Sequence, residues 1–598
     1  MKVNGTEVKV VETDLLIIGT EATGGKAALE AADLFPDCRI TVVNKQIIAR
    51  SAVTITAVAT YNAAVNPYDH PDIHTVDTIN GGSHLADQTL TKVMCDLGPQ
   101  CVHEMEAWGC KFARQEKNRE LFDCFEYPGH SKARGAYTFP YGTTGRKMVQ
   151  IMKRQILKRP NVQVLNDTYI SDILMADGRC VGALGVSLVN TQPIVFRAKA
   201  VIIGAGGGME IFRNSDAARD ATGNGYGWAY RAGSTLIDME LVQFFPTNVV
   251  TPKTMYAQQS VAVIRYALGA RLYNNKGERF MHRYDPVRGE YSTRDLTSRA
   301  MWMEILEGRG GPNGGVYLSV AHLPDNVIDN WVAKNNPGYN FGGVKLEEEG
   351  VDIKRDGLEV APMAHFYLGG ILINERCESD IPGMYAAGEV AGNLHGANRL
   401  GGNALTDCQV FGKVAGAEAA KYASTQEGLG PVNEDQVRDL VGKIDAMYKR
   451  EEGTAPHVTR DKVRDALYDV SLVKHADWIE KAMGILKDVR ENDLPAVSLT
   501  GKAESFNKEL MLALENEDLL LTAELHLKGA LMREETRGAQ CRTDFPDTDN
   551  ENWCKNILYR KDGDDVKMWT RDVDFHFYKP DWVVQKEKEA AGAARTGQ

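Results

Sequence analysis

The chain has 598 residues, of which 43% are hydrophobic and 25% are charged, and its formal net charge at pH 7 is -12. This length is too great for one hydrophobic core, so about two to four domains are expected. The acidic balance and the absence of a basic stretch argue against a nucleic-acid partner. The longest apolar runs are shorter than the roughly 20 residues of a membrane helix, so no direct membrane span is expected.

The first 12 residues are polar and alternating, unlike a secretory signal. This favours a cytoplasmic location, with membrane association only through partner subunits. The ten cysteines include no Cys-x-x-Cys pair. Because iron–sulfur clusters and structural zinc sites need closely spaced cysteines, no metal site is expected in this chain.

The first elements predict a dinucleotide-binding unit. A strand over Val8–Ile18 runs into a turn with Gly19 and Gly24, and a helix and a second strand follow by residue 43. This order is the context that a dinucleotide fingerprint requires. The middle glycine of the fingerprint is replaced by Glu21, so either this side chain points away from the phosphates or the phosphates lie slightly further out.

Two further segments have the composition of a nucleotide site. After the second strand, where many dinucleotide-binding folds place an acid for the ribose, the chain has Asn44 and Lys45, and this position is uninformative by itself. Gly206 lies in a glycine-rich turn after a buried strand, and Gly223 and Asn224 lie in another such turn. Several glycine turns that converge on one ligand are much stronger evidence than any one of them.

A longer glycine-punctuated stretch runs from Met384 to Ala423. It contains a strand that ends in Gly-Glu389, a loop with His395, Asn398 and Arg399, and then a helix-compatible run. A permanent cation in such a loop indicates an anionic substrate, because the planar guanidinium matches a carboxylate. The alternative is that Arg399 only clamps the loop.

This stretch resembles the flavoprotein subunits of succinate dehydrogenases and fumarate reductases. The family pattern is Gly-Glu followed by His-Gly-Ala-Asn-Arg-Leu-Gly-x-Asn-x-Leu, which matches residues 388–389 and 395–405. The resemblance implies FAD as the cofactor, with Glu389 at its ribose and Asn403 and Leu405 along the flavin. It also implies that Arg399 binds a substrate carboxylate.

The same resemblance implies an α/β fold with an interrupted nucleotide domain. A Rossmann-like FAD-binding domain is expected over residues 1–239 and 357–430. An inserted α+β capping domain is expected over 240–356, and a helical carboxy-terminal domain with its tail over 431–598.

Residues 50–54 bear on how the flavin is attached. They read Arg-Ser-Ala-Val-Thr, where respiratory members of the family have Arg-Ser-His-Thr and carry the flavin on the histidine. No histidine occurs between residues 25 and 69, so non-covalent FAD is predicted, with Ser51 as a cofactor contact. The absence of the covalent link favours reduction over succinate oxidation.

Two residues of the central region resemble catalytic groups of the family. Arg294 matches the arginine that donates a proton to the α-carbon of the substrate, although a salt network with Asp295 at a helix start is an alternative. His365 matches a histidine that contacts the substrate carboxylate.

Two departures change the expected substrate. Phe245 stands where the family has the histidine that binds a second carboxylate, and the family Thr-Glu pair falls on Ala262 and Val263. Both changes replace hydrogen-bonding groups with apolar ones, which argues against fumarate. The nearby Arg265 is a candidate to restore the contact.

The carboxy-terminal part is polar and has helical periodicity. Residues 537–553 resemble the family segment Arg-Gly-Ala-His…Asp-Phe-Pro…Asn-Trp, which implies an iron–sulfur partner subunit; the alternative is a solvated bundle without a partner.

The expected activity is hydride transfer from flavin N5 to the C=C bond of an unsaturated carboxylate. The rival interpretations are an adenylylsulfate reductase-type flavoprotein and a non-catalytic electron-relay flavoprotein.

Overall fold

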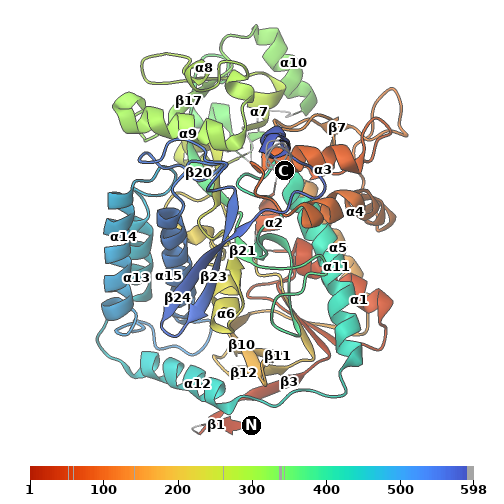
Figure 1. Ribbon diagram of the computed structural model, residues 1–598, viewed down its shortest axis with the longest axis vertical. Coiled ribbons are helices and arrows are strands. Elements are labelled where there is room, and N and C mark those ends of the chain that lie inside the picture. The colour runs from red at the N-terminus through yellow and green to blue at the C-terminus, as the bar shows by residue number, and fades with distance from the viewer. Residues whose placement is uncertain are drawn as a thin grey trace, which may run out of the picture.

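The computed structural model describes residues 1–3, 5–50, 53–57, 60–139, 142–259, 262–335, 340–341, 344–586 and 588 (Figure 1). At its centre is a five-stranded parallel sheet of order β22-β13-β4-β5-β9. Its strands are β4 (Leu15–Ile18), β5 (Ile40–Val43), β9 (Val162–Leu165), β13 (Ala200–Ile203) and β22 (Met384–Ala386). A parallel sheet buried on both faces explains why these strands are continuous apolar runs.

Small residues set the helix packing on one face of this sheet. Helix α1 (Ala22–Leu34) packs against α11 (Asn403–Thr425) and α5 (Thr144–Ile156), and α4 (Gln88–Ala107) packs on α11. A Cβ on Gly416 would lie 2.3 Å from the carbonyl oxygen of Ala27, so the two long helices approach each other through their backbones. This brings the start of α11 close to the end of β4.

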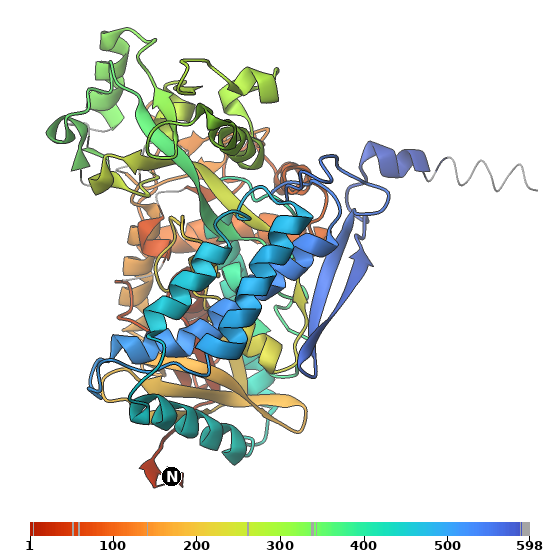
Figure 2. The ribbon, with the colours of Figure 1, turned by 90° about the vertical axis from the view of Figure 1, so that its left-hand side faces the viewer.

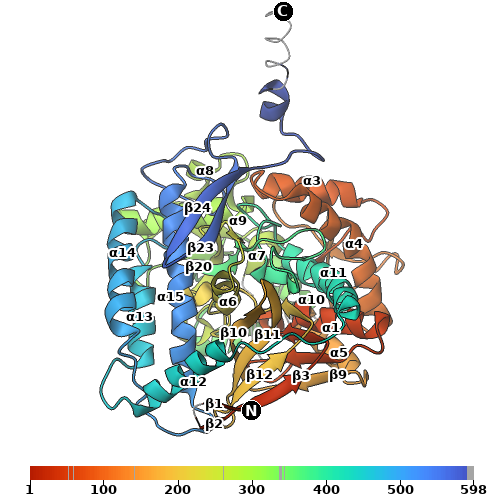
Figure 3. The ribbon, with the colours of Figure 1, turned by 60° about the horizontal axis from the view of Figure 1, so that its bottom comes forward.

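A second sheet covers the other side of β13. Its order is β10-β11-β12-β3, and β11 packs on β13. The strands are β3 (Lys9–Glu12), β10 (Thr168–Ala176), β11 (Arg179–Ser187) and β12 (Pro193–Arg197). Helix α12 (Glu434–Lys449) lies beneath this sheet (Figure 3).

The capping region has a sheet and a core of its own (Figure 2). The sheet order is β15-β20-β17-β16. The strands are β15 (Val242–Thr251), β16 (Arg271–Tyr273), β17 (Val316–Ser319) and β20 (Leu358–Tyr367), and the helices are α7 (Ala262–Ala267), α8 (Met281–Tyr284), α9 (Arg294–Glu304) and α10 (Asp325–Asn335). The predicted boundary after residue 356 falls just before β20, which still belongs to this sheet.

The carboxy-terminal part contains strands as well as the expected helices. Helices α13 (Pro456–Ala466), α14 (Ala476–Asp488) and α15 (Lys508–Met532) pack together, and a hairpin of β23 (Lys555–Asp562) and β24 (Asp565–Asp572) follows. Strand β23 pairs with β14 (Leu236–Ile237), so the end of the chain extends a sheet of the FAD-binding part.

The remaining described elements are short or connect the sheets. They are β1 (Lys2–Val3), β2 (Thr6–Glu7), α2 (Val53–Thr56), β6 (Tyr61–Asn62), α3 (Pro71–Gly81), β7 (Cys124–Phe125), β8 (Gly135–Ala136), α6 (Asn224–Arg231), β18 (Asn340–Phe341), β19 (Val344–Lys345) and β21 (Gly370–Ile371). Within the described part of the chain, no helix has both the length and the apolar character needed to cross a bilayer.

Candidate active site

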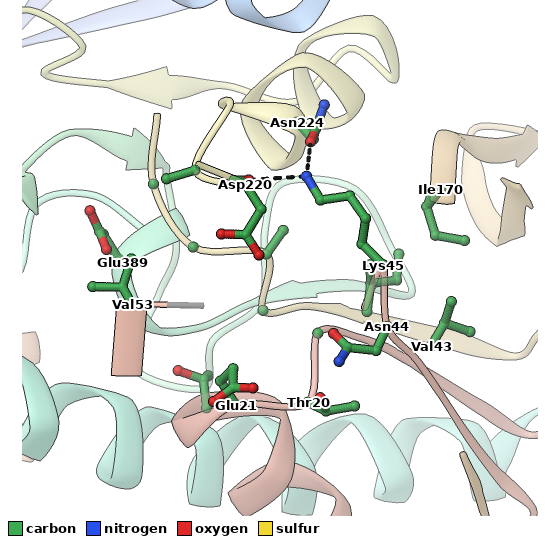
Figure 4. Close-up of a pocket in the computed structure, with 18 of the residues that line it drawn as sticks. Thr20, Glu21, Val43, Asn44, Lys45, Val53, Ile170, Asp220, Asn224 and Glu389 are labelled. Carbon is green, nitrogen blue, oxygen red and sulfur yellow. Dashed lines mark hydrogen bonds between the residues drawn. The ribbon is translucent and has the colours of Figure 1, made fainter. Parts of the chain in front are cut away.

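A cavity of about 930 Å³, which includes space open to solvent, lies at the carboxyl ends of β4, β5, β13 and β22 (Figure 4). This is where open parallel sheets bind their ligands. Six of the predicted cofactor residues line it: Gly19, Asn44, Lys45, Gly206, Asn224 and Glu389. Residues 51 and 52 are outside the described residues, so the prediction for Ser51 stays a prediction.

Glycines hold the turns around the cavity close together. Gly19 has a left-handed φ of 100°, and a Cβ there would lie 2.3 Å from the carbonyl oxygen of Gly204. Gly24 is buried in α1 and does not line the cavity. A Cβ there would lie 1.8 Å from the carbonyl oxygen of Gly19. Gly24 therefore allows the helix to approach the strand.

Lys45 joins three distant segments at one wall. Its Nζ donates to the backbone oxygen of Asp220 at 3.0 Å, to Asn224 Oδ1 at 3.3 Å and to Glu515 Oε1 at 2.5 Å. Gly223, in the left-handed region, immediately precedes α6 and presents Asn224, but it does not line the cavity itself. The contact with α15 means that the carboxy-terminal part helps to shape the cofactor cavity.

Glu389 lies between a backbone donor and a glycine. The N–H of Tyr367 donates to its Oε1 at 3.0 Å, and burial raises the pKa of Glu389 to about 7. A Cβ on Gly207 would lie 2.2 Å from that oxygen, so a side chain there would displace the carboxylate from this position. Gly207 also lines the cavity and was not among the predicted contacts.

Asn403 and Leu405 are buried beside the cavity rather than on its wall. Asn403 bonds to Asn62, His74 and Thr78 over 2.8–3.1 Å, which occupies both ends of its amide. Neither residue is part of the cavity lining. The flavin contacts predicted for Asn403 and Leu405 therefore stay predictions.

A second, small cavity of about 250 Å³, which also includes space open to solvent, lies between the capping region and the loop before α11. Its lining includes Tyr127, Tyr266, Arg294, Asn398 and Arg399. Gln243 connects the two sides, because it accepts from Arg294 Nη1 at 3.1 Å and donates to Asn398 Oδ1 at 2.9 Å. Two of the three predicted catalytic residues therefore meet at one cavity, although 105 positions separate them in the sequence.

The electrostatics of this cavity favour an anion. Arg399 is 3% exposed, and burial together with the charge of Arg294 lowers its pKa to about 9. Burial likewise lowers the pKa of Arg294. Neither guanidinium forms an ion pair with a carboxylate of the described residues. A bound carboxylate would relieve their mutual repulsion.

His365 stands next to an acid that the sequence did not reveal. Its Nδ1 lies 3.0 Å from Oδ1 of the buried Asp216, while its ring packs 5.1 Å from that of Phe245. Burial lowers the pKa of His365, and Asp216 opposes this effect. With its proton on Nδ1 directed to Asp216, His365 keeps Nε2 available for another partner.

Phe245 and Arg265 define the altered part of the site. The guanidinium of Arg294 lies 4.8 Å from the centre of the Phe245 ring. Arg265 is 1% exposed and donates to the carbonyl oxygen of Ser292 at 3.2 Å, and its Nε and Nη1 have no hydrogen-bond partner among the described residues. Ala262 and Val263 begin α7, but their side chains are outside the description.

The first cavity fits FAD. It offers glycine turns for the close approach of a pyrophosphate, the amino terminus of α1, and Glu389 for a ribose hydroxyl. Among the described residues, no group of three or more histidine, cysteine, aspartate or glutamate side chains is arranged to hold a metal. The fold and the first cavity thus define an FAD-binding protein of the oxidoreductase type.

Comparison with known proteins identifies the family. Residues 14–405 match the family described as FAD binding domain, and residues 461–587 match the one described as fumarate reductase flavoprotein C-term. The chain is 38% identical to one subunit of the fumarate reductase (CoM/CoB) of Methanothermobacter marburgensis, over 93% of this chain and 98% of that protein. It is 29% identical to the succinate dehydrogenase flavoprotein subunit of Rickettsia felis, over 91% and 92%.

Solved structures agree with this assignment. A chain of E. coli quinol fumarate reductase superposes with a TM-score of 0.87 at 26% identity, over 96% of this chain and 98% of that one. Adenylylsulfate reductase from Archaeoglobus fulgidus has a TM-score of 0.78 at 19% identity, over 96% and 98%, and shares the fold. The chain belongs to the family of fumarate reductase and succinate dehydrogenase flavoprotein subunits, and it is an FAD-dependent oxidoreductase acting on CH–CH bonds.

Proposed function

We propose that this protein reduces the C=C bond of an α,β-unsaturated acid with one carboxylate near the reacting carbons. The observation that carries the proposal is the meeting of Arg294 and Arg399 at one cavity, without a carboxylate partner among the described residues. Bound FAD supplies the hydride for the β-carbon.

Arg399 and His365 are proposed to hold the carboxylate. Arg399 is fixed by its stacking on Phe366, with the guanidinium 4.3 Å from the ring centre. Donors that meet the carboxylate oxygens also stabilise the negative charge that develops there as hydride is added.

Arg294 is proposed to give a proton to the α-carbon. Its lowered pKa favours this role, and Gln243 holds its Nη1. The hydride and this proton together convert the double bond to a single bond, and solvent returns the proton to Arg294.

The neighbourhood of Phe245 favours a substrate with an apolar group at its other end. An aromatic ring leaves a second carboxylate there without a hydrogen-bond donor, at a cost of roughly several kcal/mol. The Methanothermobacter relative is named a fumarate reductase, so fumarate is the competitor to test. Arg265 is the residue that would accommodate it.

The decisive experiment is anaerobic reoxidation of the dithionite-reduced flavin by fumarate, crotonate, an aryl acrylate and adenylylsulfate. We expect an enoate other than fumarate to reoxidise it fastest. Arg294→Gln should abolish this reaction while FAD stays bound. Arg299→Gln, on the same helix and paired with Asp295, is the matched control and should retain activity.

The outcomes separate the rival functions. Turnover by Arg294→Gln would refute the proton-donor role. Reoxidation by adenylylsulfate alone would support an adenylylsulfate reductase-type function. The absence of reoxidation by any of the four acceptors would support a non-catalytic electron-relay flavoprotein.

We also propose a cytoplasmic location and an iron–sulfur partner. The match of residues 461–587 to a fumarate reductase flavoprotein segment supports the partner, and so do relatives that are themselves named as subunits. Copurification of the chain with an iron-containing protein from its native cells tests this.

A further inference from the structure

Two carboxyl groups face the FAD cavity on the side of the α1 amino terminus. Glu21 occupies the position before the first residue of α1, and Asp220 belongs to the loop before α6; both line the cavity (Figure 4). The Glu21 side chain forms no capping hydrogen bond with its own helix. Both of its oxygens are buried, and neither forms a hydrogen bond of regular geometry with the described residues, although the backbone of Ala49 lies near the carboxyl group.

This arrangement is unfavourable for an ionised Glu21. The dinucleotide fingerprint has glycine at this position so that a pyrophosphate can approach. A carboxylate there would repel both Asp220 and the two negative charges of the pyrophosphate. A buried carboxyl group without a cationic partner avoids this cost by taking a proton.

Among the described residues that line the cavity, none offers a free positive charge to Glu21. The charged and titratable side chains that share the lining are Lys45, Tyr169, Asp220, Glu389 and Cys408. Lys45 is already held by the Asp220 backbone, Asn224 and Glu515. Glu389 and Asp220 can add only negative charge.

We propose that Glu21 is a proton-linked cofactor residue: its neutral carboxyl group donates a hydrogen bond to a pyrophosphate oxygen of FAD. A carboxyl group in this state is a donor at the position where the fingerprint offers only backbone N–H groups. Binding of FAD and binding of this proton then favour each other. The proposal concerns how the cofactor is held, so it does not depend on which acid the enzyme reduces.

The direction of the pH effect follows from this linkage. Burial, with the charge of Asp220 adding to it, raises the pKa of Glu21 to about 8 before the cofactor is considered, and the backbone of Ala49 opposes this only in part. The negative pyrophosphate raises the pKa further. The contribution of Glu21 to FAD affinity should therefore be constant below about pH 8 and fall as the pH rises above it, by up to about 10-fold per pH unit, whereas any effect of Glu389 falls nearer pH 7.

The test is the equilibrium release of FAD from the holoprotein on dilution at about pH 6 to 9.5, followed by flavin fluorescence. The wild-type chain should release more FAD as the pH rises above about 8. Glu21→Gln, which keeps the shape and a donor, should remove this dependence. Asp220→Asn should move the onset to lower pH, because the charge of Asp220 helps to raise the pKa of Glu21.

Two control variants address the other acids. Glu389→Gln leaves Glu21 in place, so it should keep the increase in FAD release above about pH 8 even if its overall affinity is weaker. Glu30→Gln, further along α1, should behave as the wild type. Circular dichroism shows whether each variant folds, and Glu21→Gly, which restores the fingerprint, replaces Glu21→Gln if that variant does not fold.

Two results would overturn the proposal. These are a pH-independent FAD affinity in the wild type and an unchanged pH dependence in Glu21→Gln. If the flavin is not released at any pH, infrared spectroscopy decides between the alternatives. A protonated-carboxyl band should then be present in the wild type at pH 7 and missing from Glu21→Gln, and identical spectra would refute the assignment.

Discussion

Arg294 and Arg399 lie in two separate motifs, and the sequence predicted both arginines to face the substrate. Each motif resembles a family segment with a substrate-facing arginine, and the structure brings both to one cavity. Asp216 was not predicted, because a single aspartate in a polar loop carries no periodic or motif signal. Backbone pairing of residues 214–216 with Ala364, which includes the bond from the Asp216 N–H to the Ala364 oxygen at 3.1 Å, places it beside His365.

Other residues predicted to contact the cofactor do not line the cavity, and their contacts stay predictions. Asn403 follows the expected loop, yet three neighbouring side chains occupy its amide. Sequence spacing identifies such a residue as near the cofactor but does not show which partners its amide prefers.

Phe245 is the residue that should control the choice of substrate. Phe245→His should raise the ratio of fumarate to crotonate reoxidation rates by about 10-fold or more, because the imidazole supplies a donor to a second carboxylate. Stopped-flow flavin absorbance measures both rates. Phe245→Leu keeps the site apolar and should leave the ratio low; an equal ratio in both variants would contradict this role.

At the scale of elements, the sequence predicted the first strand–turn–helix unit because its signals are local, although the predicted strand Val8–Ile18 is two strands, β3 and β4, in different sheets. The buried apolar strands, the glycine turn and the small-residue helix all lie within 43 residues. The pairing of β15 with β20 was not predictable in the same way, since more than 100 residues separate them and their register includes bulges. That pairing sets Phe245 beside His365.

The close approach of α1 to β4 should depend on Gly24. Gly24→Ala would place a Cβ 1.8 Å from the Gly19 carbonyl oxygen, so the turn must shift, at a cost of about 1–3 kcal/mol or more. We expect a lower thermal midpoint and weaker FAD retention. Gly484→Ala in α14, where a Cβ meets nothing within 4 Å, should be neutral or stabilising; an equal loss in both would contradict the close-approach explanation.

At the scale of the whole molecule, a buried charge cluster joins the carboxy-terminal part to the FAD-binding part. Arg533 is fully buried, and its Nε donates to Glu240 Oε1 at 2.8 Å. It also pairs with Asp238 and Glu535. The sequence showed helices here but not the hairpin or this cluster, because both depend on contacts about 300 residues apart.

Removing this arginine should cost far more than removing a surface one. Arg533→Met leaves Asp238, Glu240 and Glu535 buried around a missing cation, so the free energy of unfolding should fall by about 3–5 kcal/mol. Arg490→Met, which breaks a partly exposed pair with Glu524, should cost about 0–1 kcal/mol. Urea denaturation compares the two variants. Similar losses of unfolding free energy would argue against a stabilising role for the buried charge cluster around Arg533.

The order of strands in the central sheet also limits when the protein can become a flavoprotein during translation. β22 pairs with β13, and Lys45 reaches Glu515. The walls of the cofactor cavity thus come from residues between Ile18 and Cys408, and Lys45 in one wall is held by a residue of the carboxy-terminal part. A ribosome that adds about 5–20 residues per second needs roughly half a minute or more to reach Glu515. Until then the emerging polypeptide holds an incomplete cavity, and flavin capture belongs to the last stage of its synthesis.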